Sequence, residues 1–371
     1  METKYSSLKI IILTVIFGLG AGVVGQMLAA VYFLPQEIFI SSEENRVKQI
    51  AIQTAENEKI LEAERAISPA VLEIYLQKPT SHDPQNQIYL QKNRVALGTA
   101  LTSDGWLVSY GANLADPKNN FVILTADQKI FSPKKIIFDE ATETVFIKID
   151  AENLAVPKLG TTENLSLGEN VLIPESKQSF KTFQIADLAY EKANEPRDLL
   201  KSSEKFYKLI LLDQNADAAE IGAPLGNLSG EITGLISGIS PATVMPIDFW
   251  RNAFLDVLKE EKITRSFLGV HYINLSRAPG ISDAFSQGKT SGALIWSDKN
   301  SKTSGVIRNS PAAVALLRDG DIILKINRDE LNQKIDLSEI ISEYSSGEKI
   351  QITFSRNGEE KTADVTLGEK L

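Results

Sequence analysis

The chain of 371 residues contains no cysteine, only two histidines and no excess of basic residues. Without cysteine it can form neither a disulfide nor a thiolate metal site, and a cysteine nucleophile is excluded. Its 39 basic and 48 acidic residues give a net charge of -9, which excludes the basic face typical of nucleic-acid binding. The sequence predicts no cofactor and no metal ion. A catalytic imidazole would have to come from His82 or His271.

Charged residues are also absent from Ile10–Leu34. A helix of this length would extend about 37 Å, enough to cross a hydrocarbon core of about 30 Å. Because Lys4 and Lys9 precede it, the positive-inside rule predicts a cytoplasmic N-terminus and an exported body. We expect residues 1–35 to form a cytoplasmic tip and a single uncleaved transmembrane anchor. A signal peptide cleaved near Ala30 is the alternative.

The composition changes twice after this segment. Residues 36–66 are rich in Glu, Gln, Asn, Lys and Ala and predict a helical stalk. From Ser68 onward, short alternating apolar runs are separated by Asp-Gly and Ser-Gly turns. This pattern predicts a mainly β body, with a pair of barrels or a sandwich in residues 67–260.

Six motifs carry a resemblance to a known family. They are Ser68–Val71, Gly98–Val108, Asp139–Asp150, Val156–Gly168, Asn227–Gly234 and Met245–Asp248. In this order they resemble segments of the HtrA/DegS-like family of membrane-anchored, trypsin-like serine proteases. The resemblance implies a trypsin-like double β-barrel for residues 67–260.

The resemblance also locates the three positions of a serine protease triad. It places the imidazole at Ala112, the carboxylate at Glu143 and the nucleophile at Ile221. A triad needs a hydroxyl and an imidazole, which alanine and isoleucine cannot supply. We therefore expect a non-catalytic member of the family, a pseudoprotease. The alternative is an active serine-type endopeptidase that uses a non-standard catalytic group.

Residues 261–371 resemble a PDZ domain, most clearly over Ser310–Asn327. Phe267–Val270 is similar to the loop of such domains that binds a C-terminal carboxylate through consecutive backbone N–H groups. The peptide-binding residues implied by this resemblance are Arg265, Phe267, Leu268, Gly269, Val270, Ile307, Leu337, Ile340 and Ile341. A vestigial or internally occupied groove is the alternative.

Together these features predict a membrane-tethered, extracytoplasmic protein that binds C-terminal or extended segments of envelope proteins. It would act as an adaptor, sensor or regulator in protein quality control. A purely structural role, with the barrels as a spacer, is a further alternative. The family resemblance implies a homotrimer, or a mixed oligomer with an active relative.

Overall fold

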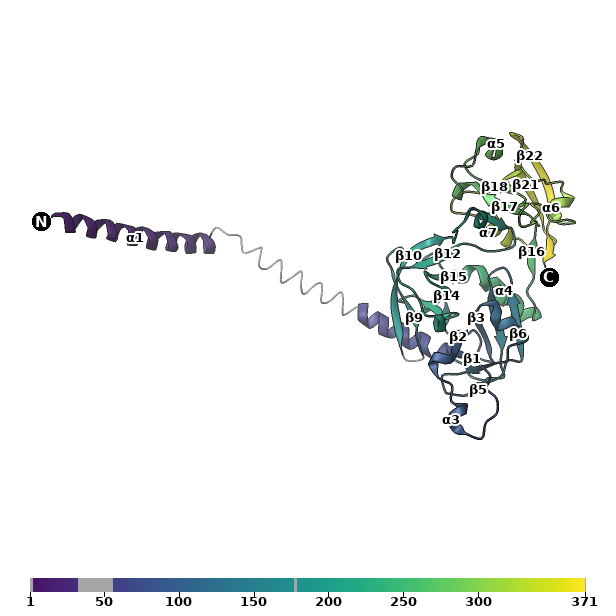
Figure 1. The fold of residues 1–371 in the computed structure, drawn as a ribbon, viewed down its shortest axis with the longest axis horizontal. Coiled ribbons are helices and arrows are strands. Elements are labelled where there is room, and N and C mark those ends of the chain that lie inside the picture. The colour runs from purple at the N-terminus through teal and green to yellow at the C-terminus, as the bar shows by residue number, and fades with distance from the viewer. Residues whose placement is uncertain (1–2, 33–55, 177–178, 371) are drawn as a thin grey trace. The chain divides into compact units, whose positions relative to one another are not determined.

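The computed structural model describes residues 3–32, 56–176 and 179–370 and divides into two units, Met1–Lys59 and Ile60–Leu371. In the first unit, helix α1 (Thr3–Tyr32) contains an apolar stretch long enough to cross a membrane, Ile12–Ala29 (Figure 1). The predicted anchor therefore coincides with a helix. Of the predicted stalk, residues 36–55 lie outside the described residues, and residues 56–66 are helical.

The first barrel of the second unit is one antiparallel sheet in the order β5-β4-β1-β2-β3-β7-β6. Its strands are β1 (Val71–Leu76), β2 (Arg94–Ala100), β3 (Trp106–Tyr110), β4 (Phe121–Leu124), β5 (Ile130–Phe131), β6 (Lys135–Asp139) and β7 (Thr144–Lys148). Short helical turns lie at η1 (Ser68–Ala70), α3 (Pro84–Gln87), η2 (Gln91–Asn93) and η3 (Ala112–Ala115). The alternating apolar side chains of these strands fill one core, as expected for a sheet with one buried face.

The second barrel has the strand order β13-β9-β10-β12-β15-β14-β8, and an additional pairing of β13 with β14 closes a ring. Its elements are β8 (Lys158–Leu159), β9 (Asn170–Pro174), β10 (Phe180–Tyr190), β12 (Leu209–Leu212), η5 (Ala218–Glu220), β13 (Pro224–Gly226), β14 (Glu231–Ile239) and β15 (Ala242–Pro246). Helix α4 (Ile247–Glu260) follows, and its buried residues Trp250, Phe254 and Val257 are spaced as on one helix face. They pack with residues of both barrels.

The PDZ domain contains a sheet in the order β17-β18-β19-β21-β22, with β20 beside β19, and a separate pair of β16 and β23. Its elements are β16 (Arg265–Phe267), β17 (His271–Asn274), η6 (Leu275–Arg277), α5 (Asp283–Ser286), β18 (Ala293–Ile295), α6 (Pro311–Val314), β19 (Ile322–Ile326), β20 (Asp329–Glu330), α7 (Leu337–Ser342), β21 (Lys349–Arg356), β22 (Glu359–Thr366) and β23 (Gly368–Lys370). The mainly β, trypsin-like fold with a C-terminal PDZ domain is confirmed.

One strand crosses between the two parts of this unit. β11 (Leu200–Ser202), which follows η4 (Pro196–Leu199), lies in sequence between two strands of the second barrel. It nevertheless pairs with β17 and forms the edge of the PDZ sheet. The sequence pattern of residues 67–260 did not predict this exchange.

Candidate functional site

The three predicted triad positions lie on loops of the barrels. Ala112 is exposed at the start of η3, and Ile221 is half-buried against the core of the second barrel. Glu143 lies in the turn between β6 and β7, with a left-handed backbone and an exposed carboxylate. That carboxylate accepts a hydrogen bond of 3.0 Å from the hydroxyl of Tyr110. Burial, together with the neighbouring Glu143, holds the pKa of Tyr110 above its ordinary value, so its hydroxyl remains a donor.

The loop that contains Ile221 is fixed by backbone contacts. The carbonyl of Ile221 accepts from the N–H of Leu97 at 2.8 Å, and its own N–H donates to Ala218. Gly222 has a φ of +75°, and a Cβ there would lie 2.2 Å from Oγ of Ser109. The buried hydroxyl of Ser109 donates to the carbonyl of Leu97 at 2.6 Å. Ser109 therefore supports the loop and is not presented to a substrate.

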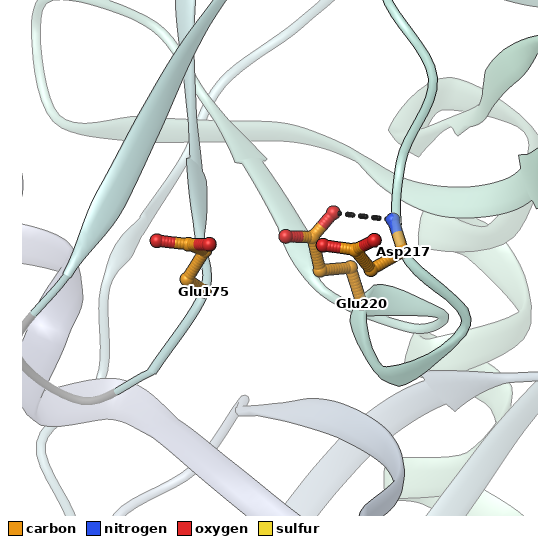
Figure 2. A group of neighbouring side chains, drawn as sticks. All are labelled: Glu175, Asp217 and Glu220. Atoms are coloured by element: carbon orange, nitrogen blue, oxygen red, sulfur yellow. Dashed lines mark hydrogen bonds between the residues drawn. The ribbon is translucent and has the colours of Figure 1, made fainter. Parts of the chain in front are cut away.

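Three carboxylates gather beside this loop, Glu175, Asp217 and Glu220, and Figure 2 shows them facing a common centre. Nζ of Lys181 lies 3.0, 2.8 and 2.7 Å from their respective oxygens. Burial opposes the charge of Lys181, but its hydrogen bonds to Asp217, Glu220 and Glu175 outweigh burial and raise the pKa of its ammonium. The ammonium thus supplies the positive charge that a metal ion would otherwise provide.

Replacement of Lys181 by methionine is expected to lower the free energy of unfolding by about 1–3 kcal/mol. The loss is moderate because the lysine is one third exposed, although Glu220 is buried and would be left without its cation. Thermal unfolding of the full chain in detergent measures the change. A matched control is Lys129→Met, which removes an ion pair to Asp127 with both partners exposed. Equal melting temperatures for the two variants would contradict the structural role.

A cleft of about 300 Å³ opens next to Glu143. Its walls include Tyr110 and Glu143 from the first barrel and Lys205 and Tyr207 from the segment after β11. Burial raises the pKa of Tyr207 to about 12. The volume is at the lower end of the range for ligand sites, so the cleft can receive a few residues of an extended chain.

The predicted carboxylate loop of the PDZ domain has the expected geometry. The N–H groups of Leu268 and Gly269 converge on one oxygen, Oε1 of Glu204, at 3.2 and 2.9 Å. The next N–H, of Val270, donates to Oγ of Ser203 at 3.1 Å. Gly269 has a φ of +82°, which glycine adopts without strain. Consecutive amides in this arrangement form a receptor for a carboxylate.

Most of the other predicted peptide-binding residues surround or support this loop. Phe267 and Ile307 are half-buried, and the N–H of Ile307 donates to the carbonyl of Gly269 at 2.9 Å. Leu337, Ile340 and Ile341 of α7 are buried in the core of the PDZ domain together with Leu268 and Val270. A cavity of about 60 Å³ remains between Glu204 and α7, with Ile341 in its wall.

The placement predicted for Arg265 is wrong. Instead of facing the carboxylate loop, its guanidinium binds both oxygens of the buried Asp139 and donates to the carbonyl of Phe249 at 3.0 Å. The guanidinium also lies 5.2 Å from the ring of Phe206. A buried carboxylate from the first barrel requires a cation, and this requirement directs Arg265 toward the barrel.

The sequence pattern did not indicate the residues that lie against the carboxylate loop, Phe267–Val270. Ser203 and Glu204 follow β11 and lie against the carboxylate loop, and Lys201 within β11 is buried. Ser203 and Glu204 contact residues more than 60 positions away, and Lys201 binds both the nearby Glu191 and the distant Asp336. The only local signal is a short polar run, Lys201–Lys205, between strands of the barrel.

Comparisons with known proteins agree with this architecture. A PDZ domain model matches residues 266–367. A probable periplasmic serine endoprotease, DegP-like, of Pseudomonas putida is 26% identical over 300 residues, covering 79% of this chain and 59% of that protein. The corresponding protein of Hahella chejuensis is 28% identical over 284 residues, covering 73% and 56%. The chain is thus similar to HtrA-type serine endoproteases over most of its length, and residues 266–367 match a PDZ domain.

Solved structures of HtrA-type proteases share the fold of this chain. The HtrA-type protease AlgW with a decapeptide superimposes with a TM-score of 0.63 at 19% identity, covering 83% of this chain and 98% of that one. A serine endoprotease from Yersinia pestis superimposes with a TM-score of 0.53 at 18% identity, covering 83% and 97%. The chain spans less than two thirds of the length of the curated relatives described above.

The prediction that the chain is not an enzyme is wrong on these comparisons. Its relatives are named serine endoproteases, and its structural neighbours are named HtrA-type proteases. Catalysis by this chain would nevertheless require a hydroxyl and an imidazole in addition to the side chains at positions 112 and 221. Because alanine and isoleucine provide neither a hydroxyl nor an imidazole, these groups would have to come from other residues.

Proposed function

We propose that this HtrA-like protein binds C-terminal or extended segments of envelope proteins through the groove of its PDZ domain. The observation that carries the proposal is the convergence of the Leu268 and Gly269 amides on a single carboxylate oxygen. The body would lie outside the cytoplasm, anchored by α1 with Lys4 and Lys9 on the cytoplasmic side. The periplasmic relatives and the length of α1 support this placement.

The groove would bind a chain end by adding it as a strand beside β17. The terminal carboxylate would accept from Leu268 and Gly269, in the place where the carboxylate of Glu204 lies. The last side chain would enter the space between Phe267, Ile307 and α7. An apolar residue suits that space, because Phe267 and Ile307 are apolar and half-buried.

Removal of the negative charge at the C-terminus of the peptide tests this proposal. We expect fluorescein-labelled decapeptides that end in valine, leucine, isoleucine or phenylalanine to bind the full chain in detergent micelles. Amidation of their C-termini should weaken binding by about tenfold or more, because a charge-assisted hydrogen bond contributes about 1.5–3 kcal/mol. Fluorescence anisotropy measures both forms. Equal affinities of the acid and amide forms would contradict recognition through the carboxylate loop.

The names of the relatives favour a second function, hydrolysis of peptide bonds. In this chain the reaction would need a hydroxyl outside positions 112, 143 and 221. Incubation with unfolded casein and with a fluorophosphonate probe tests this function. Cleavage together with labelling of one serine would support it and identify the nucleophile. Intact casein and no labelling, with binding peptides present and an active HtrA protease as control, would exclude it.

The family resemblance also supports assembly as a homotrimer or as a mixed oligomer with an active relative. Light scattering of the detergent-solubilised chain distinguishes a monomer from a trimer. A monomer at micromolar concentration would contradict the homotrimer.

A further inference from the structure

We propose that residues Leu200–Glu204 are an internal ligand of the PDZ groove, which an incoming peptide must displace before it can bind. This proposal rests on the proposed peptide-binding function and concerns its regulation. The competitor of the peptide would be a segment of the same chain, and the groove would be closed in the free protein.

The backbone of the segment reproduces the binding mode of a peptide. β11 pairs antiparallel with β17, Leu200 with Ile273 and Ser202 with His271. The pairing continues toward the loop, where the N–H of Ser203 donates to the carbonyl of Val270 at 3.0 Å. The segment therefore approaches the carboxylate loop in the direction in which an added strand would bring its C-terminus.

Glu204, at the end of the segment, takes the place of the terminal carboxylate of a peptide. Glu204 is buried, and its Oε1 accepts from the N–H groups of Leu268 and Gly269. The remaining N–H of the loop, that of Val270, donates to the Ser203 hydroxyl. With these amides engaged, a second carboxylate has no donor in the loop, and the two ligands exclude each other.

A buried ion cluster holds the middle of the segment. Nζ of Lys201 donates to Oδ2 of Asp336 at 2.7 Å and lies 2.6 Å from Oε2 of Glu191. Asp336 caps the N-terminus of α7, the helix beside the groove, and also accepts from the hydroxyl of Tyr272 at 2.8 Å. The segment is thus bound both to the strand and to the helix that border the groove.

The internal ligand does not fill the groove completely. The cavity of about 60 Å³ beside Glu204 is bounded by Ser338 and Ile341 of α7 and by polar side chains that include Asp256 of α4 and Arg265. The side chain of Glu204 is directed to the loop amides, so displacement would exchange one carboxylate for another. The apparent affinity for peptide is the intrinsic affinity multiplied by the fraction of molecules in which the groove is open.

Two variants of the full chain in detergent test the competition. Glu204→Gln removes the charge of the internal ligand and should increase affinity for the labelled decapeptides by about tenfold or more. Ser202→Cys with His271→Cys places two thiols on paired strands, at a spacing compatible with a disulfide. Since the chain has no other cysteine, oxidation can lock the segment in the groove.

The oxidised double variant should bind no decapeptide, and reduction of the same variant should restore binding. The exposed Glu163→Gln is the control for loss of a charge and should bind as the unmodified chain does. Melting temperatures confirm that each variant is folded. Equal binding by the oxidised and reduced forms, or unchanged affinity in Glu204→Gln, would overturn the internal ligand. Absence of binding in every form would overturn the peptide-binding function itself.

Discussion

Arg265→Met is expected to lower the free energy of unfolding by about 3–5 kcal/mol, the range for breaking a buried ion pair by removing one partner. The side chain of Asp139 is 2% exposed and would be left buried without its cation. Its other contacts, the N–H of Ala141 at 3.1 Å and the hydroxyl of Thr142 at 2.6 Å, do not neutralise it. The substitution should also weaken the contact between the first barrel and the PDZ domain.

Urea-induced unfolding of the full chain, followed by tryptophan fluorescence, measures this loss. Lys135→Met is a matched control, since it breaks an ion pair to Glu261 whose partners are 40% and 64% exposed. That change should cost less than about 1 kcal/mol. The double variant Asp139→Asn, Arg265→Met should recover part of the stability, because no buried charge is then left unpaired. Equal stabilities of Arg265→Met and Lys135→Met would contradict the argument.

Gly269→Val is expected to abolish binding of decapeptides, with a loss of affinity of about 100-fold or more, since two charge-assisted hydrogen bonds depend on this loop. A Cβ at this position would lie 2.3 Å from Cβ of Ser310 and 3.0 Å from the ring of Phe267. The backbone φ of +82° is also strained for a β-branched residue. The loop must therefore move, and its amides no longer converge.

Fluorescence anisotropy on the Glu204→Gln background isolates this effect from the internal ligand. Gly288→Ala provides the control, because Gly288 has a φ of +73° but no atom within 4 Å of the added Cβ. It should retain the affinity of its background, at a cost in stability of about 1 kcal/mol. Unimpaired binding by a folded Gly269→Val variant would contradict a role of the carboxylate loop in peptide binding.

The parts of the fold that sequence could predict are those specified by local pattern. Alternation and Asp-Gly turns indicated the strands, and the apolar run indicated α1. The ordered motifs from Ser68 to Asp248 identified the double barrel. Similarly, the resemblance of Phe267–Val270 to a family motif identified the carboxylate loop, and Gly269 there has a positive φ that glycine adopts without strain.

The parts that sequence could not predict depend on partners far along the chain. Arg265 was assigned to the carboxylate loop because of its proximity in sequence, whereas the buried Asp139, 126 residues away, binds it. Lys201 and Asp336 are separated by 135 residues. Burial of a lysine at β11 is favourable only with carboxylate partners, here Asp336 and Glu191, and a single sequence does not specify such pairs. The exchange of β11 into the PDZ sheet follows from these contacts.

Amide hydrogen exchange of the full chain, with and without a saturating decapeptide, reports on the groove and on its internal ligand together. The groove should remain occupied throughout, so the amides of Leu268–Val270 should stay protected in both states. Residues Leu200–Glu204 should be protected in the free chain and exchange faster once peptide is bound. Unchanged protection of Leu200–Glu204 at saturation, with peptide bound elsewhere, would contradict both the assigned groove and its internal ligand.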